Sequence, residues 1–204
     1  MRKIIAAIAV LLVAVALIVV LAGDKGDKSK EKPQEMSMGM PAMPTAELAK
    51  MDVFVGTWSG DEVINFPGMP PNTKTKSTIV TKRILGGRYF MGTYKGGWEG
   101  EDGKWVDFEG ISISTYDPDK QTYREWWFDS DGMASEAQAK WADDKTYVGE
   151  SSGEMMGQPY QSRGTTKIVS PTKHVMKMEM DTGQGWFTAM EGTYTKQAEK
   201  KASK

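Results

Sequence analysis

Hydrophobic and polar residues alternate in short runs between about residues 53 and 196. The run 174–181 reads HVMKMEMD, so one set of alternate positions holds His and Met, and the other is mostly charged. The run 133–141 reads MASEAQAKW and separates Met, Ala and Trp from Glu, Gln and Lys in the same way. Because successive side chains of a strand point to opposite faces of a sheet, both runs predict strands with one dry and one wet side.

Turn-forming residues separate these runs, and no long amphipathic helix interrupts them. Asp and Gly tolerate the left-handed backbone of tight turns, and Pro presets φ. The pattern is typical of a sandwich or a barrel, and closure into a barrel removes the exposed edges. We therefore expect an all-β, antiparallel up-and-down barrel of about 8–10 strands, wide enough to enclose one small ligand. The expected turns are Gly86-Gly87, Gly96-Gly97, Asp117-Pro118-Asp119, 129–132, Asp143-Asp144, Ser170-Pro171 and Thr182-Gly183.

A short helix is expected immediately before the first strand. Thr45 can act as its N-cap, and the residues from Ala46 to Met51 are good helix formers. All the aromatic residues lie between Phe54 and Tyr194. We place the barrel domain at residues 47–197 and a disordered, Lys- and Ala-rich tail at residues 198–204.

The first residues have the pattern of an export signal. Arg2 and Lys3 precede an apolar run from Ile4 to Ala22, which is long enough to span a bilayer as a helix. Residues 1–22 are either a cleaved signal peptide, since Ala22 suits a cleavage site, or a signal anchor that stays in the membrane as a helix. Either outcome predicts an exported protein, periplasmic or secreted, that contacts a membrane only through residues 4–22 when these are retained.

Residues 23–46 have the composition of a flexible linker. They are rich in Lys, Met and Pro and contain no aromatic residue, so they offer little apolar surface to offset the entropy of ordering. Met36, Met38, Met40 and Met43 are soft thioether ligands that could bind Cu(I) in an exported compartment. The alternative interpretation is that these methionines are filler in a low-complexity linker.

Composition removes several classes of protein. The chain of 204 residues has no Cys and one His, which excludes disulfide-dependent domains, thiol enzymes, Cys-ligated metal sites and multi-histidine metal sites. Its 26 basic and 27 acidic residues give a net charge of −1, which argues against nucleic-acid binding. We expect no metal and no cofactor. The protein partner, if there is one, is not indicated by the sequence.

Five short motifs occur in the order seen in one bacterial family. They are Phe54-Val55-Gly56-Thr57-Trp58, Ile84-Leu85-Gly86-Gly87-Arg88, Tyr116-Asp117, Trp127-Phe128-Asp129-Ser130 and the His174 strand. Over about residues 48–196 the chain resembles the domain of unknown function 1579 family, which is thought to be lipocalin-like. The resemblance implies a barrel in which Trp58 plugs one end, and it implies no reaction. Thr115 stands where the family usually has Gly before Tyr-Asp, and the long linker is extra.

The ligand-binding candidates are residues expected to line the barrel interior. Trp58 could floor a cavity or only pack, and Arg88 could anchor a carboxylate or instead stack on an aromatic ring or form an ion pair. Large and soft side chains supply the rest of the wall, with small residues such as Ala137 leaving space. The full set is Trp58, Arg88, Phe90, Tyr94, Ile113, Trp127, Met133, Trp141, His174, Met176 and Met178.

No catalytic residue is assigned. His174 could hold haem or serve as a base, but no nucleophile elbow accompanies it, and packing is the plainer role. Glu109, Glu125 and Glu150 lie in expected strands without forming a recognisable pair. Asp129 and Asp131 fit a hairpin turn better than a calcium loop, which needs its full ligand series.

The sequence therefore favours an exported, non-enzymatic barrel that binds a small, mainly apolar molecule in its interior. One alternative is a structural or protein-interaction module of the cell envelope, which would use the aromatic face around Trp126. A second alternative is an enzyme that uses buried carboxylates.

Overall fold

The computed structural model of the protein describes residues 45–100, 102–155 and 157–198, and within them the alternating segments form antiparallel strands. The expected signal or anchor helix and nearly all of the expected linker lie outside these ranges. In chain order the elements are α1 (Thr45–Lys50), the 3₁₀ segment η1 (Met51–Phe54), β1 (Gly56–Ile64), β2 (Thr73–Ile84), the 3₁₀ segment η2 (Leu85–Gly87), β3 (Tyr89–Glu99), β4 (Trp105–Asp117), β5 (Thr122–Asp129), β6 (Ala134–Trp141), β7 (Thr146–Met155), β8 (Gln158–Ser170), β9 (Lys173–Asp181) and β10 (Trp186–Lys196).

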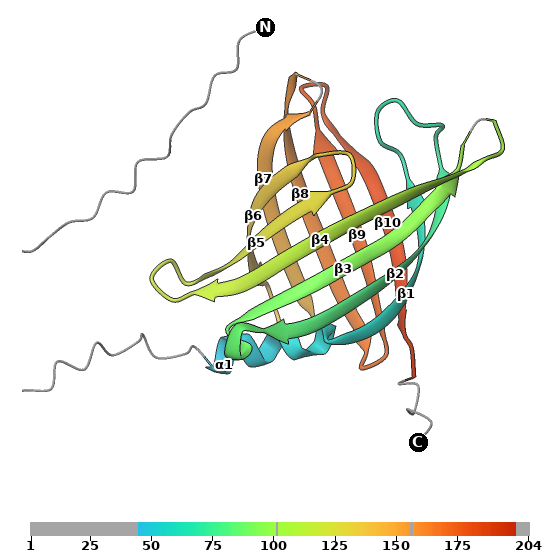
Figure 1. Cartoon of the computed structure of the whole chain (residues 1–204). Helices are drawn as coiled ribbons and strands as arrows, with labels where there is room; N and C mark the ends of the chain where they lie inside the picture. Colours follow the sequence, from blue (N-terminus) through green and yellow to red (C-terminus); the bar gives the residue numbers. More distant parts are fainter. Residues whose placement is uncertain (1–44, 101, 156, 199–204) are drawn as a thin grey trace, which may run out of the picture. The chain divides into compact units, whose positions relative to one another are not determined.

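The strands close into a barrel (Figure 1). Each pairs with its neighbours in sequence, and β1 also pairs with β10, in a register that runs from Trp58 opposite Lys196 to Ile64 opposite Met190. Within the described residues the barrel has ten strands, which confirms the all-β up-and-down prediction at the upper end of its range. No helix in the described part of the chain has the length and hydropathy of a membrane span.

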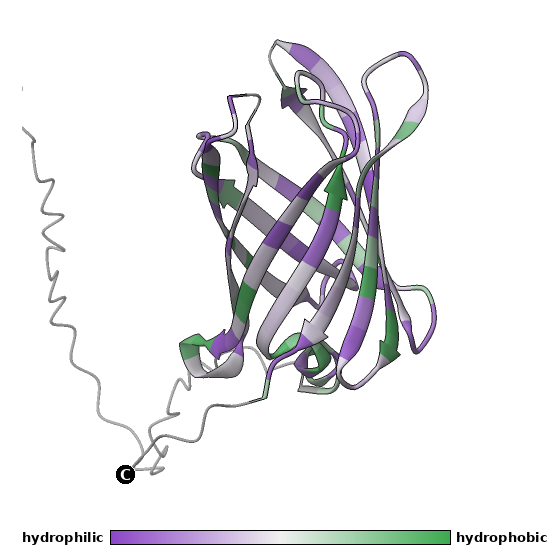
Figure 2. Cartoon of the chain, turned by 90° about the vertical axis from the view of Figure 1, so that its right-hand side faces the viewer, coloured by the Kyte–Doolittle hydropathy of each residue, from purple (hydrophilic) through white to green (hydrophobic). Residues whose placement is uncertain are grey.

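The register assigns each alternate position to the inner or the outer face. The His174 side of β9 is the inner one, since His174 lies opposite Tyr194 and both are buried. Lys177 and Glu179 of the same strand bond to each other at the outer face. Figure 2 shows hydrophobic and hydrophilic residues interspersed along the strands of the wall. The predicted division of 174–181 into two faces is confirmed.

One expected turn is wrong. Gly96 and Gly97 lie within β3 rather than between strands. Neither position has room for a side chain, because a Cβ on Gly97 would lie 2.1 Å from the carbonyl oxygen of Val106, with the Trp105 ring 2.9 Å away. A Cβ on Gly96 would lie 2.8 Å from the carbonyl oxygen of Lys76. These glycines therefore permit close approach of backbone and ring within the sheet.

The N-terminal helix closes one end of the barrel (Figure 1). Leu48 and Met51 are 1% and 4% exposed and pack against inward-facing side chains of the strands. Arg83 of β2 holds this plug: its Nε and Nη2 donate to the two carboxylate oxygens of Asp52 at 2.6 and 2.8 Å, and Nη2 also donates to the carbonyl of Leu48. The buried residues of this cluster are Leu48, Met51, Phe90, Tyr123, Ala139 and Tyr147.

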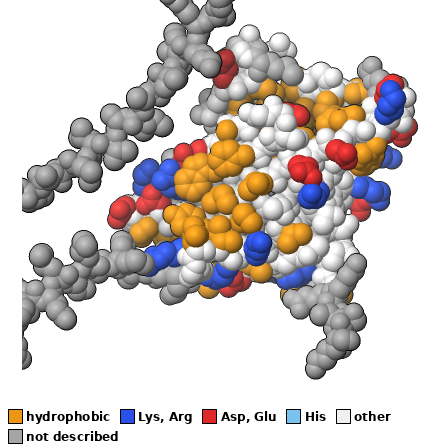
Figure 3. Space-filling model, in the orientation of Figure 1, with side chains coloured by type: hydrophobic (Ala, Val, Ile, Leu, Met, Phe, Trp, Pro, Cys, Tyr) orange, Lys and Arg blue, Asp and Glu red, His pale blue; other side chains and the backbone are white. Residues whose placement is uncertain are grey.

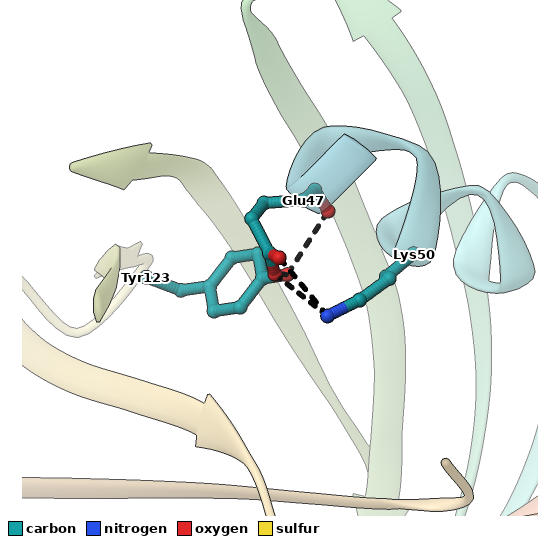
Figure 4. A network of polar contacts seen from close by, with 3 residues as sticks. All are labelled: Glu47, Lys50 and Tyr123. Atoms are coloured by element: carbon teal, nitrogen blue, oxygen red, sulfur yellow. Dashed lines mark hydrogen bonds and ion pairs between the residues drawn. The ribbon is translucent and has the colours of Figure 1, made fainter. Parts of the chain in front are cut away.

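A second anchor joins the helix to β5 (Figure 4). The hydroxyl of Tyr123 lies 2.9 Å from the carbonyl oxygen and 3.0 Å from the carboxylate of Glu47, to both of which it is placed to donate. Lys50 donates to the same carboxylate. Burial raises the pKa of Tyr123, and the pKa of Glu47 is lowered chiefly by its bond from Lys50. The hydroxyl therefore stays protonated and able to donate.

The opposite end holds a second apolar cluster, beside the turns that join β7 to β8 and β9 to β10. Tyr160, Met180 and Ala189 are buried there, with Phe66 and Phe187 packed against them. The core of the barrel is thus divided between its two ends.

The part of the barrel interior next to β8 is not filled by side chains. Gly164 of β8 lies opposite Gly149 and Met178 on the inner face, and a Cβ built on it would meet no atom within 4 Å. Met176 and Met178, also on the inner face, are only partly buried. Space next to an inward-facing glycine means that the interior is hollow at this level.

Two glycine substitutions test this hollow. We expect Gly164→Ala to stabilise the protein by about 0.5–1 kcal/mol, because it reduces the entropy of the unfolded chain and the added methyl enters open space. Gly110→Ala faces the same interior, but its Cβ would lie 2.2 Å from the Trp127 ring, so we expect destabilisation of about 1–3 kcal/mol. Urea unfolding of the full chain measures both. Equal destabilisation by the two substitutions would contradict a hollow interior.

Candidate functional site

A cavity of about 160 Å³ lies in the wall of the interior formed by β4, β5 and β6. Cross-strand pairing brings its residues together: Trp127 lies between Ser112 and Ser135, and Glu125 lies between Ser114 and Ala137. The lining residues are Ser112, Ser114, Glu125, Trp126, Trp127, Ser135 and Ala137. The cavity therefore combines one carboxyl group, three hydroxyls and two tryptophans.

Glu125 is the ionisable group of this cavity. The hydroxyl of Tyr147 donates to its Oε1 at 2.9 Å, and among the described residues Oε2 has no hydrogen-bond partner. Burial raises the pKa of Glu125, and the bond from Tyr147 opposes that shift only in part. Burial also raises the pKa of Tyr147. Glu125 is thus a partly buried acid in the lining of the cavity, and one of its oxygens has no donor among the described residues.

Glu62 is a second inner carboxyl group, and its surroundings are different. It is 3% exposed and accepts hydrogen bonds from Thr75 at 2.6 Å, Ser77 at 2.7 Å, Tyr94 at 2.7 Å and Tyr194 at 2.8 Å. Burial beside this carboxylate raises the pKa of both tyrosines. Four donors use the lone pairs of both oxygens, so Glu62 ties β1, β2, β3 and β10 together.

The closed end contains an aromatic stack around His174. Its ring lies 4.9 Å from the Tyr194 ring and 4.5 Å from the Trp58 ring, measured between centroids, and Trp58 donates from Nε1 to the carbonyl of Phe54. Nδ1 of His174 is buried and has no hydrogen-bond partner among the described residues. Burial lowers the pKa of His174 to about 4. Trp58 therefore plugs the barrel end, as the resemblance implied.

The outer wall of β3, β4 and β5 carries a patch of hydrophobic side chains (Figure 3). Ile111 and Phe128 lie opposite each other and are 45% and 48% exposed. Ile113 lies opposite Met91 and Trp126, and the guanidinium of Arg124 covers the Trp126 ring at 4.7 Å. The register thus places aromatic side chains on both faces of β5, with Trp127 inside and Trp126 outside.

A larger groove of about 650 Å³ lies over β1 to β4. It includes outward side chains of both signs, and Lys95 and Glu109 in it form an ion pair with an N–O distance of 2.7 Å. Trp105 lines it and donates from its indole to Asp107. Its charges are largely satisfied and exposed, so the inner cavity is the better candidate for a binding site.

The register places most of the predicted ligand-binding residues on the inner face. Tyr94, Trp127, Met176 and Met178 face the middle of the interior, where Tyr94 is bonded to Glu62. Four others are packed into the closed end, namely Trp58, Phe90, Trp141 and His174. Arg88 lies between η2 and β3, and its carbonyl accepts a bond from Thr115, the residue that replaces the family's usual glycine.

One predicted position is corrected. Ile113 points outward, because its neighbours Ser112 and Ser114 line the inner cavity. Met133 lies in the turn between β5 and β6, where its N–H donates to Oδ1 of Asp129. The same Asp129 oxygen accepts from Asp131, which is the hairpin geometry expected from the sequence. In the described residues no three His, Asp or Glu side chains gather as a cation site.

Sequence reasoning missed Glu62 and the importance of Arg83. Glu62 lies in the run SGDEVI, where its alternation with Trp58 and Ile64 was a usable signal for the inner face. Arg83 forms an ion pair with Asp52 and lies over the Phe90 ring at 4.8 Å. Of the three glutamates considered from the sequence, Glu125 is the one that reaches the cavity.

Comparison with known proteins finds one family and several structures of similar fold. The model of the family described as "Protein of unknown function (DUF1579)" matches residues 43–196. No curated protein matches the chain.

Two solved structures resemble the barrel. The S-type phycobiliprotein lyase CPES of Guillardia theta aligns with a TM-score of 0.52 at 10% identity, over 78% of this chain and 96% of that chain. Rv2717c of M. tuberculosis aligns with a TM-score of 0.55 at 12% identity, over 74% of this chain and 97% of that chain. At these identities the likeness concerns the fold.

Protonation of His174 should make stability depend on pH. The pKa is about 4 in the folded state and 6.5 for an ordinary His, so between these values the unfolded state binds more protons. Stability should fall as the pH is lowered from about 6.5 to 4, with a His174 contribution of about 3 kcal/mol.

His174→Phe isolates this contribution. We expect the unfolding free energy of the parent minus that of the variant to decrease steadily as the pH falls from 6.5 to 4. Above pH 7 this difference should be constant. Denaturant titrations at several pH values measure it. Parallel pH profiles for the two proteins would show that His174 does not titrate in the expected range.

Proposed function

The chain belongs to the family described as Protein of unknown function (DUF1579), and on this premise we propose that it is a non-enzymatic carrier of one small, mainly apolar molecule. The ligand would occupy the hollow middle of the barrel, beside the cavity of β4 to β6. The carrier would act outside the cytoplasm, as the apolar run from Ile4 to Ala22 behind Arg2 and Lys3 suggests.

The observation that carries this proposal is the hollow at Gly164. A protein interior normally packs as densely as an organic crystal, so unfilled space bordered by Met176 and Met178 is a cost to folding. A bound apolar molecule would restore the missing dispersion contacts. The open position at Gly164 and the partly buried methionines are what a ligand of this kind would contact.

The closed end and the wall of the barrel support the same function. The plug of α1, held by Arg83 and Asp52, seals one end against water. Glu62 and its four hydroxyl donors tie β1, β2, β3 and β10 into a stiff wall. Rigid walls around a preformed space lower the ordering cost of binding.

A pair of tryptophan substitutions tests the carrier function. We expect the neutral fluorophore N-phenyl-1-naphthylamine to bind the full chain with increased emission. Gly164→Trp should fill the interior and weaken binding by about tenfold or more. Thr165→Trp is the matched control, since it adds the same side chain to the outer face of the same strand and should leave binding unchanged.

Thermal melting of both variants checks that they fold. Binding that survives Gly164→Trp, or that is lost equally in Thr165→Trp, would place the probe outside the barrel. No binding by the parent chain would count against a carrier of apolar molecules.

Glu125 supports a second candidate, an enzyme. A partly buried acid with a raised pKa that lines a cavity is suited to proton transfer, and one protein of similar fold is named a lyase. In that case a compound captured by the parent protein should be chemically altered when released, and a compound captured by Glu125→Gln should not. Mass spectrometry of the released compound decides, and identical masses from both proteins would favour the carrier.

A further inference from the structure

We propose that the interior selects apolar molecules that carry a basic nitrogen, and that Glu125 binds the protonated nitrogen through its free carboxyl oxygen. This inference rests on the carrier function and adds the chemical class of the ligand. It comes from the position of Glu125, the polar groups around it and the balance of charge in the barrel.

Only one carboxyl oxygen of Glu125 has a hydrogen-bond donor among the described residues. Oε1 is taken by Tyr147, whereas Oε2 has no partner in the described part of the chain. On the side of β7 the nearest wall is a glycine: a Cβ added to Gly149 would still be 3.7 Å from Oε2. The absence of a side chain at Gly149 therefore leaves Oε2 open to a ligand in the middle of the barrel.

The other polar groups of the cavity suit a nitrogen that donates several hydrogen bonds. An ammonium has up to three donors and no acceptor. Ser112, Ser114 and Ser135 present hydroxyl oxygens that can accept them. Trp127 contributes a ring, and the face of an indole attracts a cation.

The charges of the interior favour a cation over an anion. Glu62 and Glu125 both lie on the inner face, and between the two end clusters none of the inward strand positions of the described residues holds Lys or Arg. Arg83 is bound to Asp52 at the closed end, and Lys196 lies over the Trp58 ring there. A ligand carboxylate would meet two acids and no counter-charge, which disfavours fatty acids and similar molecules.

Glu62 and Glu125 differ in how completely their oxygens are used. Glu62 has four hydroxyl donors and needs no cation, while Glu125 has one donor. Burial raises the pKa of Glu125, because the hydrogen bond from Tyr147 only partly replaces the hydration that the ionised carboxylate loses. A bound cation would stabilise the ionised form further. The ligand would thus complete an environment that the protein leaves incomplete.

Four probes with the same phenyl body but different ends test the inference. They are ethylbenzene, 2-phenylethanol, 2-phenylethylamine and phenylacetate, titrated calorimetrically into the full chain at pH 7. We expect the amine to bind about tenfold more tightly than the alcohol, the gain expected of a charge-assisted hydrogen bond, and phenylacetate to bind most weakly.

Two substitutions assign the effect to Glu125. Glu125→Gln keeps the shape of the side chain and should reduce amine binding by about tenfold while leaving ethylbenzene binding unchanged. Glu150→Gln removes the same charge from the outer face of β7 and should change neither. The ranking of the four probes on the parent chain does not depend on how well the Gln variant folds.

The outcomes separate the inference from the function on which it rests. If ethylbenzene binds but the amine has no advantage over the alcohol, or if Glu125→Gln leaves amine binding intact, the selection of a basic nitrogen is wrong and the carrier function stands. If none of the four probes and no N-phenyl-1-naphthylamine binds, both are wrong.

Discussion

The pairing of β1 with β10 is the constraint on which the rest of the structure depends. It gives every described strand two hydrogen-bonded neighbours and leaves the sheet without an edge. A barrel's diameter grows with the number of strands, and an eight-stranded barrel is only just filled by its own side chains. With ten strands in the described part of the chain, closure sets a wider interior than the inner residues fill, and Gly164 lies beside the unfilled space.

The two ends compensate for this hollow middle. At the closed end Leu48 and Met51 bury the helix against the strands, and the pair of Arg83 and Asp52 fixes it in place. Hydrophobic stabilisation is roughly proportional to the apolar area removed from water, so concentrating it at the ends lets the middle stay open. The hydroxyl network on Glu62 ties four strands of the wall together.

The two inner acids show how similar groups can take different roles. Four hydroxyls satisfy Glu62, which makes it part of the wall. One hydroxyl donates to Glu125, which lines the cavity, and its other oxygen has no donor among the described residues. Burial penalises the ionised form of Glu125 and one donor offsets that penalty only in part, so the second acid is where we expect selectivity for a ligand.

The sequence by itself determined the all-β class, the N-terminal helix and the two faces of 174–181, because alternation and turn chemistry are local properties of the chain. It could not determine which face of Gly110–Ser114 is the inner one. There Ile alternates with Ser, and the usual rule predicts Ile inside, yet Ser112 lines the cavity and Ile113 is outside. The tertiary structure decided this. The Trp127 ring occupies the space over Gly110, where no side chain would fit. Gly110 and the alternate residues Ser112 and Ser114 therefore face the interior, and the isoleucines face outward.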